Sequence, residues 1–409
     1  TCPKPSKDYL PSCWQAGVII EDRCLKEGLG EQECARRAEE ARINHVSAGV
    51  PGHLAIPGVE IEEWLDSGQC KDCFIPSFNY RPAGSAQYAL ALGNFEKETI
   101  RRFRFGFIAS SDNHRSRPGT GYKEIDRFVT TEANGPPNES VRRSIYPLVE
   151  PVSNSLKLDR ENFPALGFGA FEAERMSSFF TTGGLAAVHS KNRSREGIWN
   201  AMQRKETYGT SGDRILLWFD LINEDETFTP MGGEVKTSSQ PYFRVKAVGA
   251  FKQKPGCPDY KLTEISENDL MKICKNECYN PSDERKIINR IEVIRIIPQI
   301  KTSENIDSLI QDPWKTFTCL PDQDGCEVTF VDQEFPQLKR DVTYYIRAIQ
   351  EASPSINAKN IRCEYDDQGN CNKVNICYGD YRTSREDDCL SLIEERAWSS
   401  PIYLEHLDS

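Results

Sequence analysis

The sequence predicts an α/β fold in its first part and a β-rich, sandwich-like region after it. Two stretches indicate the α/β part, residues 85–111 and 183–220, because each joins a helix to an apolar strand. A helix beside a buried strand is typical of one αβ unit of a barrel or an open sheet. Short alternating strands separated by Gly, Pro, Asn and Asp indicate the β-rich part. We therefore expect two domains, residues 1–215 and 216–409, with residues 1–80 as a disulfide-rich insertion.

Length and charge restrict the class of protein. The 409 residues are enough for two or three domains with a sizeable core. The 51 Lys and Arg residues stand against 62 Asp and Glu, a formal net charge of −11. This negative net charge argues against a protein that binds nucleic acid through its overall charge. No run of 18 apolar residues occurs, so we expect no membrane span.

Fifteen cysteines fall into two clusters, six before residue 74 and nine after residue 256. Such clustering in polar, loop-rich sequence favours disulfides and an oxidising compartment, so we expect a secreted or periplasmic protein. The odd total leaves at least one thiol unpaired or paired outside this chain. Cys70-x-x-Cys73 is alternatively half of a zinc site or a redox pair.

The first αβ stretch contains the leading candidate for a metal site. Ser85 is expected to cap a helix that continues to about Thr99. A strand follows in which Phe103, Phe105 and Phe107 alternate with other residues, the pattern of a strand with one buried face. It leads into Asp112-Asn113-His114. Residues two apart at a strand end point the same way, so Asp112 and His114 could bind one cation; a capped loop is the alternative.

The second αβ stretch contains a candidate pocket. A short strand, Leu185 to Val188, ends at His189. Ser194 is expected to cap a helix to about Lys205, and Thr207 to Gly212 forms a tight loop. Arg193 and Arg195 near this helix start could hold an anion. The alternative is a well-capped αβ unit with solvated arginines.

Four strands are expected in the second half, where the residues alternate between apolar and polar: Tyr242 to Val248, Arg290 to Ile297, Glu327 to Val331 and Val342 to Ile349. An earlier helix is expected over Glu31 to Asn44, where Cys34, Ala38 and Ala41 recur at helical spacing.

Four segments carry a resemblance to a known family: SSDNHRSRPGTGYKE, GGLAAVHSKNRSREGIWNAMQRKETYGTSGDRI, YYIRAIQE and EERAWSSPIYL. The chain resembles the C-terminal two-thirds of a large bacterial family known as domain of unknown function 3604. That family is related to the PHP (polymerase and histidinol phosphatase) metal-dependent hydrolases.

The resemblance implies a partial, distorted PHP-like β/α barrel that binds two or three divalent ions, Zn, Mn or Fe. A metal-activated water would attack a phosphoester or related ester in a small anionic substrate. The resemblance implies that Asp112 and His114 are metal ligands and that His189 and the loop containing Tyr208 come near the site. The predicted catalytic residues are His189 and Arg193, and the predicted substrate-binding residues are Arg117, Lys123 and Tyr208. For the basic residues Arg117 and Lys123 the alternative is a solvated loop.

The sequence departs from the family at one place. The family begins with a strand carrying Asp-Leu-His-x-His-Thr, and no His-x-His occurs among the five histidines here. We therefore expect that this chain is a fragment, or that the first strands belong to a separate chain. The predicted function is an exported metal-dependent hydrolase, incomplete without those ligands. The alternative is a non-catalytic exported binding or scaffold protein.

The metal site is testable by elemental mass spectrometry on native material. We expect near-stoichiometric zinc, manganese or iron that disappears when Asp112→Ala and His114→Ala are combined, because both ligands are then lost. Absence of metal from protein whose intact mass matches these 409 residues alone would contradict the prediction.

Overall fold

The computed structural model describes residues 1–71, 78–79, 84–97, 99–111, 122–131, 135–159, 172, 175, 184–356 and 361–407. The chain forms two compact units and crosses between them several times. The first unit comprises Thr1–Tyr80, Glu124–Thr181 and Pro354–Ile393. The second comprises Arg81–Lys123, Thr182–Ser353 and Glu394–Ser409.

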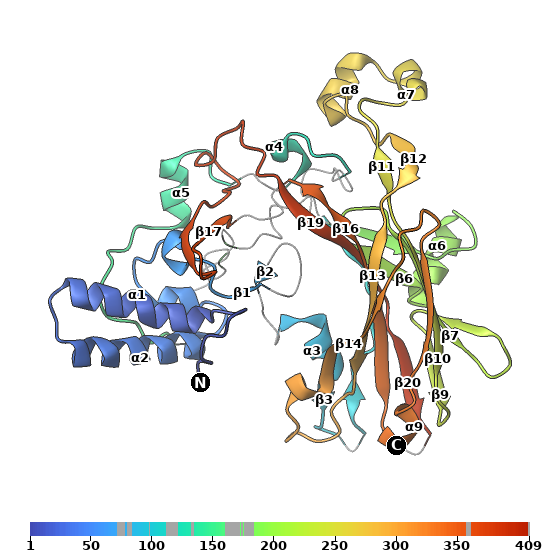
Figure 1. Cartoon of the computed structure of the whole chain (residues 1–409), viewed down its shortest axis with the longest axis horizontal. Coiled ribbons are helices and arrows are strands. Elements are labelled where there is room, and N and C mark those ends of the chain that lie inside the picture. Colours follow the sequence, from blue (N-terminus) through green and yellow to red (C-terminus); the bar gives the residue numbers. More distant parts are fainter. Residues whose placement is uncertain are drawn as a thin grey trace. The chain divides into compact units, whose positions relative to one another are not determined.

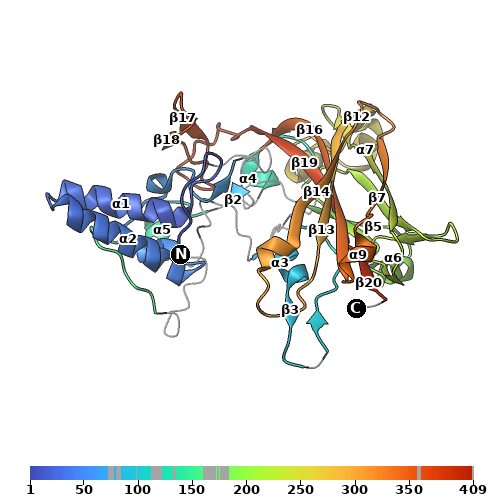
Figure 2. The same ribbon diagram turned by 60° about the horizontal axis from the view of Figure 1, so that its bottom comes forward.

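A pair of helices dominates the first unit. The helices α1 (Ser12–Lys26) and α2 (Glu31–Ala48) lie side by side (Figures 1 and 2). The second contains the helix predicted from the sequence. Gly17 permits their close approach, because a Cβ there would lie 2.6 Å from Arg42 Nε. The disulfide Cys24–Cys34 ties the turn between the helices.

The rest of the first unit consists of short elements joined by loops. A buried arginine, Arg127, holds one of these loops by donating to the carbonyl oxygens of Tyr378, Thr383, Ser384 and Asp387. The short elements are η1 (Gly52–Ala55), η2 (Ile61–Trp64), β1 (Gln69–Cys70), β2 (Phe78–Asn79), α4 (Arg127–Thr130), α5 (Glu139–Ile145), β17 (Cys363–Tyr365) and β18 (Cys371–Val374).

Two larger sheets dominate the described part of the second unit (Figure 1), and the pairs β3 (Gly93–Asn94) with β4 (Arg101–Arg102) and β11 (Phe251–Gln253) with β12 (Pro281–Arg285) add two short ones. The four-stranded sheet has the order β15 (Cys326–Val331), β10 (Tyr242–Val248), β7 (Leu216–Ile222) and β8 (Phe228–Pro230). The larger sheet has the order β14 (Ile310–Thr318), β13 (Ile288–Ile296), β16 (Val342–Ser355), β19 (Ser391–Ser399), β6 (Thr207–Thr210) and β5 (Leu185–Val188). It also includes β20 (Ile402–His406), which pairs with β16 and with β9 (Glu234–Thr237). The strands predicted in the second half are confirmed as β10, β13, β15 and β16.

The main hydrophobic core lies between these two sheets. Phe243 of β10 is fully buried, and its ring centroid lies 4.9 Å from that of Phe330 and 4.8 Å from that of Tyr344. Its neighbour Tyr242 is 53% exposed, because successive residues of a strand point to opposite faces. The aromatic contact between β10 and Tyr344 of β16 therefore joins the sheets.

The remaining elements of the second unit connect or cover these strands. They are α3 (Ala86–Ala91), β3 (Gly93–Asn94), β4 (Arg101–Arg102), α6 (Arg195–Gln203), β11 (Phe251–Gln253), α7 (Asp259–Glu264), α8 (Glu267–Cys274), β12 (Pro281–Arg285), η7 (Ile306–Leu309) and α9 (Phe335–Leu338). The predicted cap is confirmed, since Ser85 Oγ accepts from the backbone N–H of Tyr88 at 3.1 Å. The helix ends at Ala91 rather than near Thr99.

The aromatic segment after β4 is not the strand that its alternation predicts. Phe105 and Phe107 pack against the large sheet, with Phe107 5.2 Å from Tyr345 between ring centroids. Side chains hold its backbone: Phe107 N–H donates to Ser400 Oγ, and Tyr403 Oη donates to the carbonyl oxygen of Phe105. The alternation is therefore satisfied by packing on a sheet face, without the ladder of a strand.

The predicted PHP-like β/α barrel is wrong. Within the described ranges every sheet is open, and the sheets are mostly antiparallel, whereas β20 pairs parallel with β9. Strands β5 and β6 show the physical reason. A barrel requires them to be parallel, but they pair antiparallel from Leu185 with Thr210 to Val188 with Thr207, although α6 lies between them in sequence. The strand–helix–strand pattern indicated the elements and not their direction.

Six disulfides join described cysteines: Cys2–Cys13, Cys24–Cys34, Cys257–Cys278, Cys319–Cys326, Cys363–Cys371 and Cys377–Cys389. Cys274 is free, and Cys70 is disulfide-bonded, whereas Cys73 lies outside the described residues. This pattern is compatible with an oxidising, extracytoplasmic compartment. Among the described helices, none has the length and apolar character needed to span a bilayer.

The core contact between the sheets is testable by mutation. We expect Phe243→Ala to lower the free energy of unfolding by about 3–5 kcal/mol, because it leaves a cavity between three aromatic rings. Tyr242→Ala, on the outer face of the same strand, should cost less than about 1 kcal/mol. Urea unfolding of both variants measures the difference, and equal losses would contradict the assigned faces.

Candidate functional site

The two predicted metal ligands and one predicted substrate-binding residue fall in a gap between described residues. Asp112, His114 and Arg117 lie outside the described residues, which end at Ser111 and resume at Tyr122. Their roles stay predictions. Just before this gap in the described residues, the carbonyl oxygen of Ser110 accepts from the N–H of Gly184, which precedes β5, at 3.1 Å.

His189 and Tyr208 are brought together beside the main core. Their ring centroids lie 5.5 Å apart. His189 Nε2 lies 2.8 Å from the carbonyl oxygen of Leu217, and Tyr208 Oη donates to the carbonyl oxygen of Ile215 at 3.1 Å. Burial raises the pKa of Tyr208. Both polar groups are thus engaged by backbone carbonyls, and their catalytic and binding roles stay predictions.

Arg193 and Lys123 lie in different surroundings. Arg193 is exposed and precedes Ser194, whose Oγ accepts from the backbone N–H of Gly197 and caps α6 as predicted. Lys123 is buried, and its Nζ lies 2.5 Å from Glu277 Oε2 and 2.8 Å from the carbonyl oxygen of Gly256. Lys123 therefore ties two loop segments together.

A buried polar cluster in the first unit contains two histidines. Burial lowers the pKa of His45 to about 4, and Glu172 acts against that shift. Arg175 lies 2.8 Å from Glu172 and, with His53 and His45, holds the pKa of that carboxyl below its ordinary value against the effect of burial. At neutral pH the cluster therefore contains a neutral His45 and an ionised Glu172 paired with Arg175.

The described residues do not form a divalent metal centre of the predicted kind. Two groups of three potential ligands come close together there: Cys257, Cys274 and Cys278, and Asp66, Cys363 and Cys371. In each group two of the cysteines are joined in a disulfide, so their sulfurs are not thiolate ligands. These two groups therefore do not support a metal-dependent reaction.

A second polar cluster forms where the loop after β6 meets β19. The loop supplies Ser211 and Asp213, and β19 supplies Glu395. Ser211 Oγ donates to Glu395 Oε2 and accepts from the backbone N–H of Arg396 at 2.9 Å. The backbone N–H of Ser211 in turn donates to the carbonyl oxygen of Arg396 at 2.9 Å. The tight turn thus holds the hydroxyl against the carboxyl.

Two further residues, Lys286 and Gln350, bind the carboxylate of Asp213. Lys286 Nζ lies 2.7 Å from Asp213 Oδ2, and Gln350 Nε2 donates to the same oxygen at 2.5 Å. Lys286 also donates to Ser353 Oγ at 3.0 Å. The ammonium group is therefore committed to Asp213 and leaves Glu395 without a direct ion pair to Lys286.

The carboxyl of Glu395 has a raised pKa. Glu395 is 4% exposed. Burial, followed by the negative charge of Asp213, raises its pKa to about 7, against the opposing effects of Ser211, Lys286 and Arg396. A buried carboxyl that exchanges a proton near neutral pH is a recognised feature of functional sites. The chemistry available here is general acid–base catalysis.

The other face of the large sheet carries paired charges. Arg290 binds both oxygens of Glu394, at 2.7 and 2.9 Å, and Arg347 Nε donates to Glu292 Oε2 at 2.7 Å. Burial, followed by the charge of Arg347, lowers the pKa of Arg396 to about 10. These carboxylates are matched by guanidinium groups, in contrast to Glu395.

Sequence analysis did not identify Glu395, although a signal was present. The run Glu394-Glu395-Arg396 interrupts an otherwise apolar strand, and buried positions rarely hold three charges in succession. The segments YGTSGDR and EERAW that carried the resemblance meet at Ser211 and Glu395.

A family model described as "Protein of unknown function (DUF3604)" matches residues 87–252. The resemblance to a family of unknown function is therefore confirmed for that stretch, which includes Ser211 and Asp213 and ends before Glu395. No curated protein and no solved structure matches the chain.

The pKa of Glu395 predicts a specific pH dependence of stability. A raised carboxyl pKa means that the folded state holds a proton that the unfolded state has released, so stability falls as pH rises from about 4.5 to about 7. Glu395→Gln removes this effect. It should stabilise the protein by roughly 3 kcal/mol at about pH 8 and change little at about pH 4.

Urea unfolding at both pH values measures this difference. Glu327→Gln on the exposed face of β15 is the matched control, and we expect no pH-dependent change from it. The same effect of Glu395→Gln at both pH values would contradict the raised pKa.

Proposed function

We propose that the chain is a hydrolase of phosphoester or related ester bonds in which Glu395 is the general acid–base group. The observation that carries the proposal is the contact between Ser211 and a buried carboxyl whose pKa is about 7. At neutral pH both protonation states of such a group are populated, which suits proton transfer in either direction.

The half-buried hydroxyl of Ser211 provides the path between Glu395 and solvent. The ionised carboxyl draws the Ser211 proton, and the hydroxyl can then accept a proton from an attacking water. The protonated carboxyl returns the proton along the same path to the leaving group. Ser211 is held for this relay by the backbone N–H of Arg396.

Metal dependence remains part of the proposal on the strength of the sequence alone. It rests on Asp112 and His114 and on the resemblance to the family of unknown function, with His189, Arg193, Arg117 and Tyr208 near the substrate. A bound divalent ion would supply an acidified water. A further segment or chain would be needed for the remaining ligands.

The second candidate is a non-catalytic, exported binding or scaffold protein. The specific observation in its favour is that His189, Tyr208 and Lys123 all hydrogen-bond to backbone carbonyls. Side chains used in this way stabilise a fold without catalysis.

Hydrolysis is testable with the nitrophenyl esters of phosphate, phosphodiester and acetate, with and without added zinc, manganese or iron. We expect Glu395→Gln to lower kcat by about 10²-fold or more, because the amide cannot exchange a proton. The wild-type rate should change with pH around 7, the pKa of Glu395, and the variant should lack this dependence.

Glu327→Gln serves again as the control and should keep the wild-type rate, since its side chain is exposed on another strand. Folding of both variants is checked by circular dichroism. A wild-type protein that is inactive on all these esters under every metal condition would favour the scaffold candidate.

A further inference from the structure

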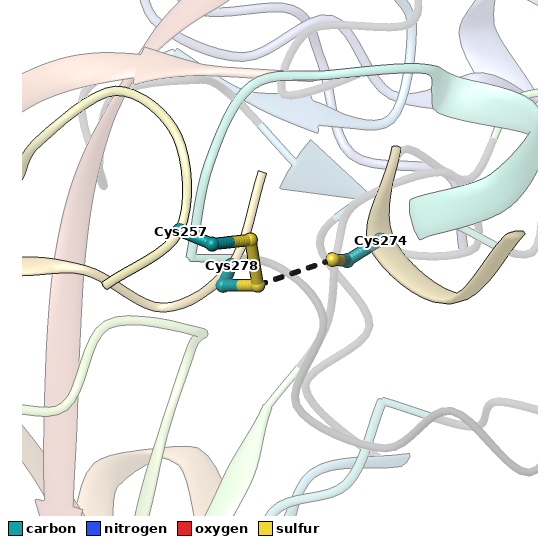
Figure 3. Close-up of side chains that lie close together, drawn as sticks. All are labelled: Cys257, Cys274 and Cys278. Carbon is teal, nitrogen blue, oxygen red and sulfur yellow. Dashed lines mark hydrogen bonds between the residues drawn. A yellow bond between two sulfur atoms is a disulfide. The ribbon is translucent and has the colours of Figure 1, made fainter. Parts of the chain in front are cut away.

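Three cysteines lie together at the base of the excursion that joins β11 to β12 (Figure 3). Cys257 and Cys278 form a disulfide, whereas Cys274, the last residue of α8, has a free thiol. The Sγ of Cys274 lies 3.3 Å from the Sγ of Cys278. This distance falls within the range of about 3–3.5 Å that separates reacting atoms before a bond forms.

We propose that these three cysteines form a thiol–disulfide exchange site, an activity independent of ester hydrolysis. The Cys274 thiolate attacks Cys278 Sγ, and a Cys274–Cys278 bond forms. The Cys257–Cys278 bond breaks, and its electron pair leaves on Cys257, which takes up the proton that Cys274 released. One disulfide and one thiol are present before and after the step, so it requires no external oxidant or reductant.

Lys123 makes the step reversible by holding the two arms of the excursion together. Its Nζ binds the carbonyl oxygen of Gly256 and the carboxylate of Glu277, the residues that precede the two disulfide partners. Gly256 N–H also donates to Glu277 Oε2 at 2.7 Å. These contacts do not depend on the disulfide, so a released Cys257 stays beside Cys278 and can attack it in return.

The exchange changes which part of the excursion is covalently closed. The Cys257–Cys278 bond spans a sequence separation of 21 residues and encloses α7 and α8. The alternative bond spans 4 residues, so it releases from the covalent loop both α7 and all of α8 except its last residue. A longer closed loop restricts the chain more strongly. The site therefore switches the excursion between a restrained and a less restrained form. All three cysteines are half-buried, so thiol reagents can reach them.

The test maps free thiols on the purified chain. Protein held at mildly alkaline pH is denatured in mild acid, where exchange is slow because thiolate is scarce, and is labelled with N-ethylmaleimide. Peptide mass spectrometry then locates the label. We expect one label per chain within this cluster, divided between Cys274 and Cys257. Label confined to Cys274 overturns the proposal.

Two variants test directly whether Cys274 and Cys278 can pair. Cys257→Ser should contain the Cys274–Cys278 disulfide and take no label at either residue. Cys274→Ser is the matched control: it lacks the attacking thiol and should retain Cys257–Cys278 without label. Two labels in Cys257→Ser, in protein whose circular dichroism matches wild type, overturn the proposal, since Cys274 and Cys278 then do not pair.

Discussion

The second unit depends on a strand, β16, that is buried on both faces. One face places Tyr344 and Ile346 in the core between the sheets, and the other places Tyr345 and Arg347 beneath further chain. A buried charge is tolerated only when it is paired, because the cost of leaving water is otherwise too high. Arg347 meets this condition through Glu292 and Asp312. By the same constraint, the buried charged residues of the neighbouring strands β13 and β19 also need partners of opposite charge.

Glu395 differs from the other buried carboxylates because its neighbourhood does not supply a dedicated cation. Glu394, the preceding residue of β19, points to the opposite face and binds Arg290 through both oxygens. Lys286 instead lies against Asp213, and the net effect on Glu395 is a pKa near neutrality. Two adjacent glutamates thus have different roles, one as a structural ion pair and one as a proton-exchanging group, set by their surroundings. The exchange site at Cys274 is separate from this arrangement in its residues and in its chemistry.

Sequence reasoning succeeded where a local pattern determines the outcome. The caps at Ser85 and Ser194 and the alternation of β10 were all readable, because each depends on residues close in sequence. Strand direction was not readable, since the antiparallel pairing of β5 with β6 depends on how a helix and its loops cross the sheet. The strand predicted for the segment around Phe105 was also wrong, because an alternating pattern indicates a buried face and does not show that the backbone pairs with a neighbouring strand. The contact of Ser211 with Glu395 joins residues 184 apart in sequence, and no local pattern reveals such a pair.

The acid–base role of Glu395 requires that this side chain keeps its proton close to neutral pH, which an infrared titration of the carboxyl groups measures. Difference spectra of wild type and Glu395→Gln isolate the signal of this one side chain. We expect a protonated carboxyl band in wild type that is lost with a midpoint of about pH 7 and is absent from the variant. If the bands of both proteins vanish together near the ordinary glutamate pKa of about 4.3, Glu395 is ionised at neutral pH and the proposed acid–base role is wrong.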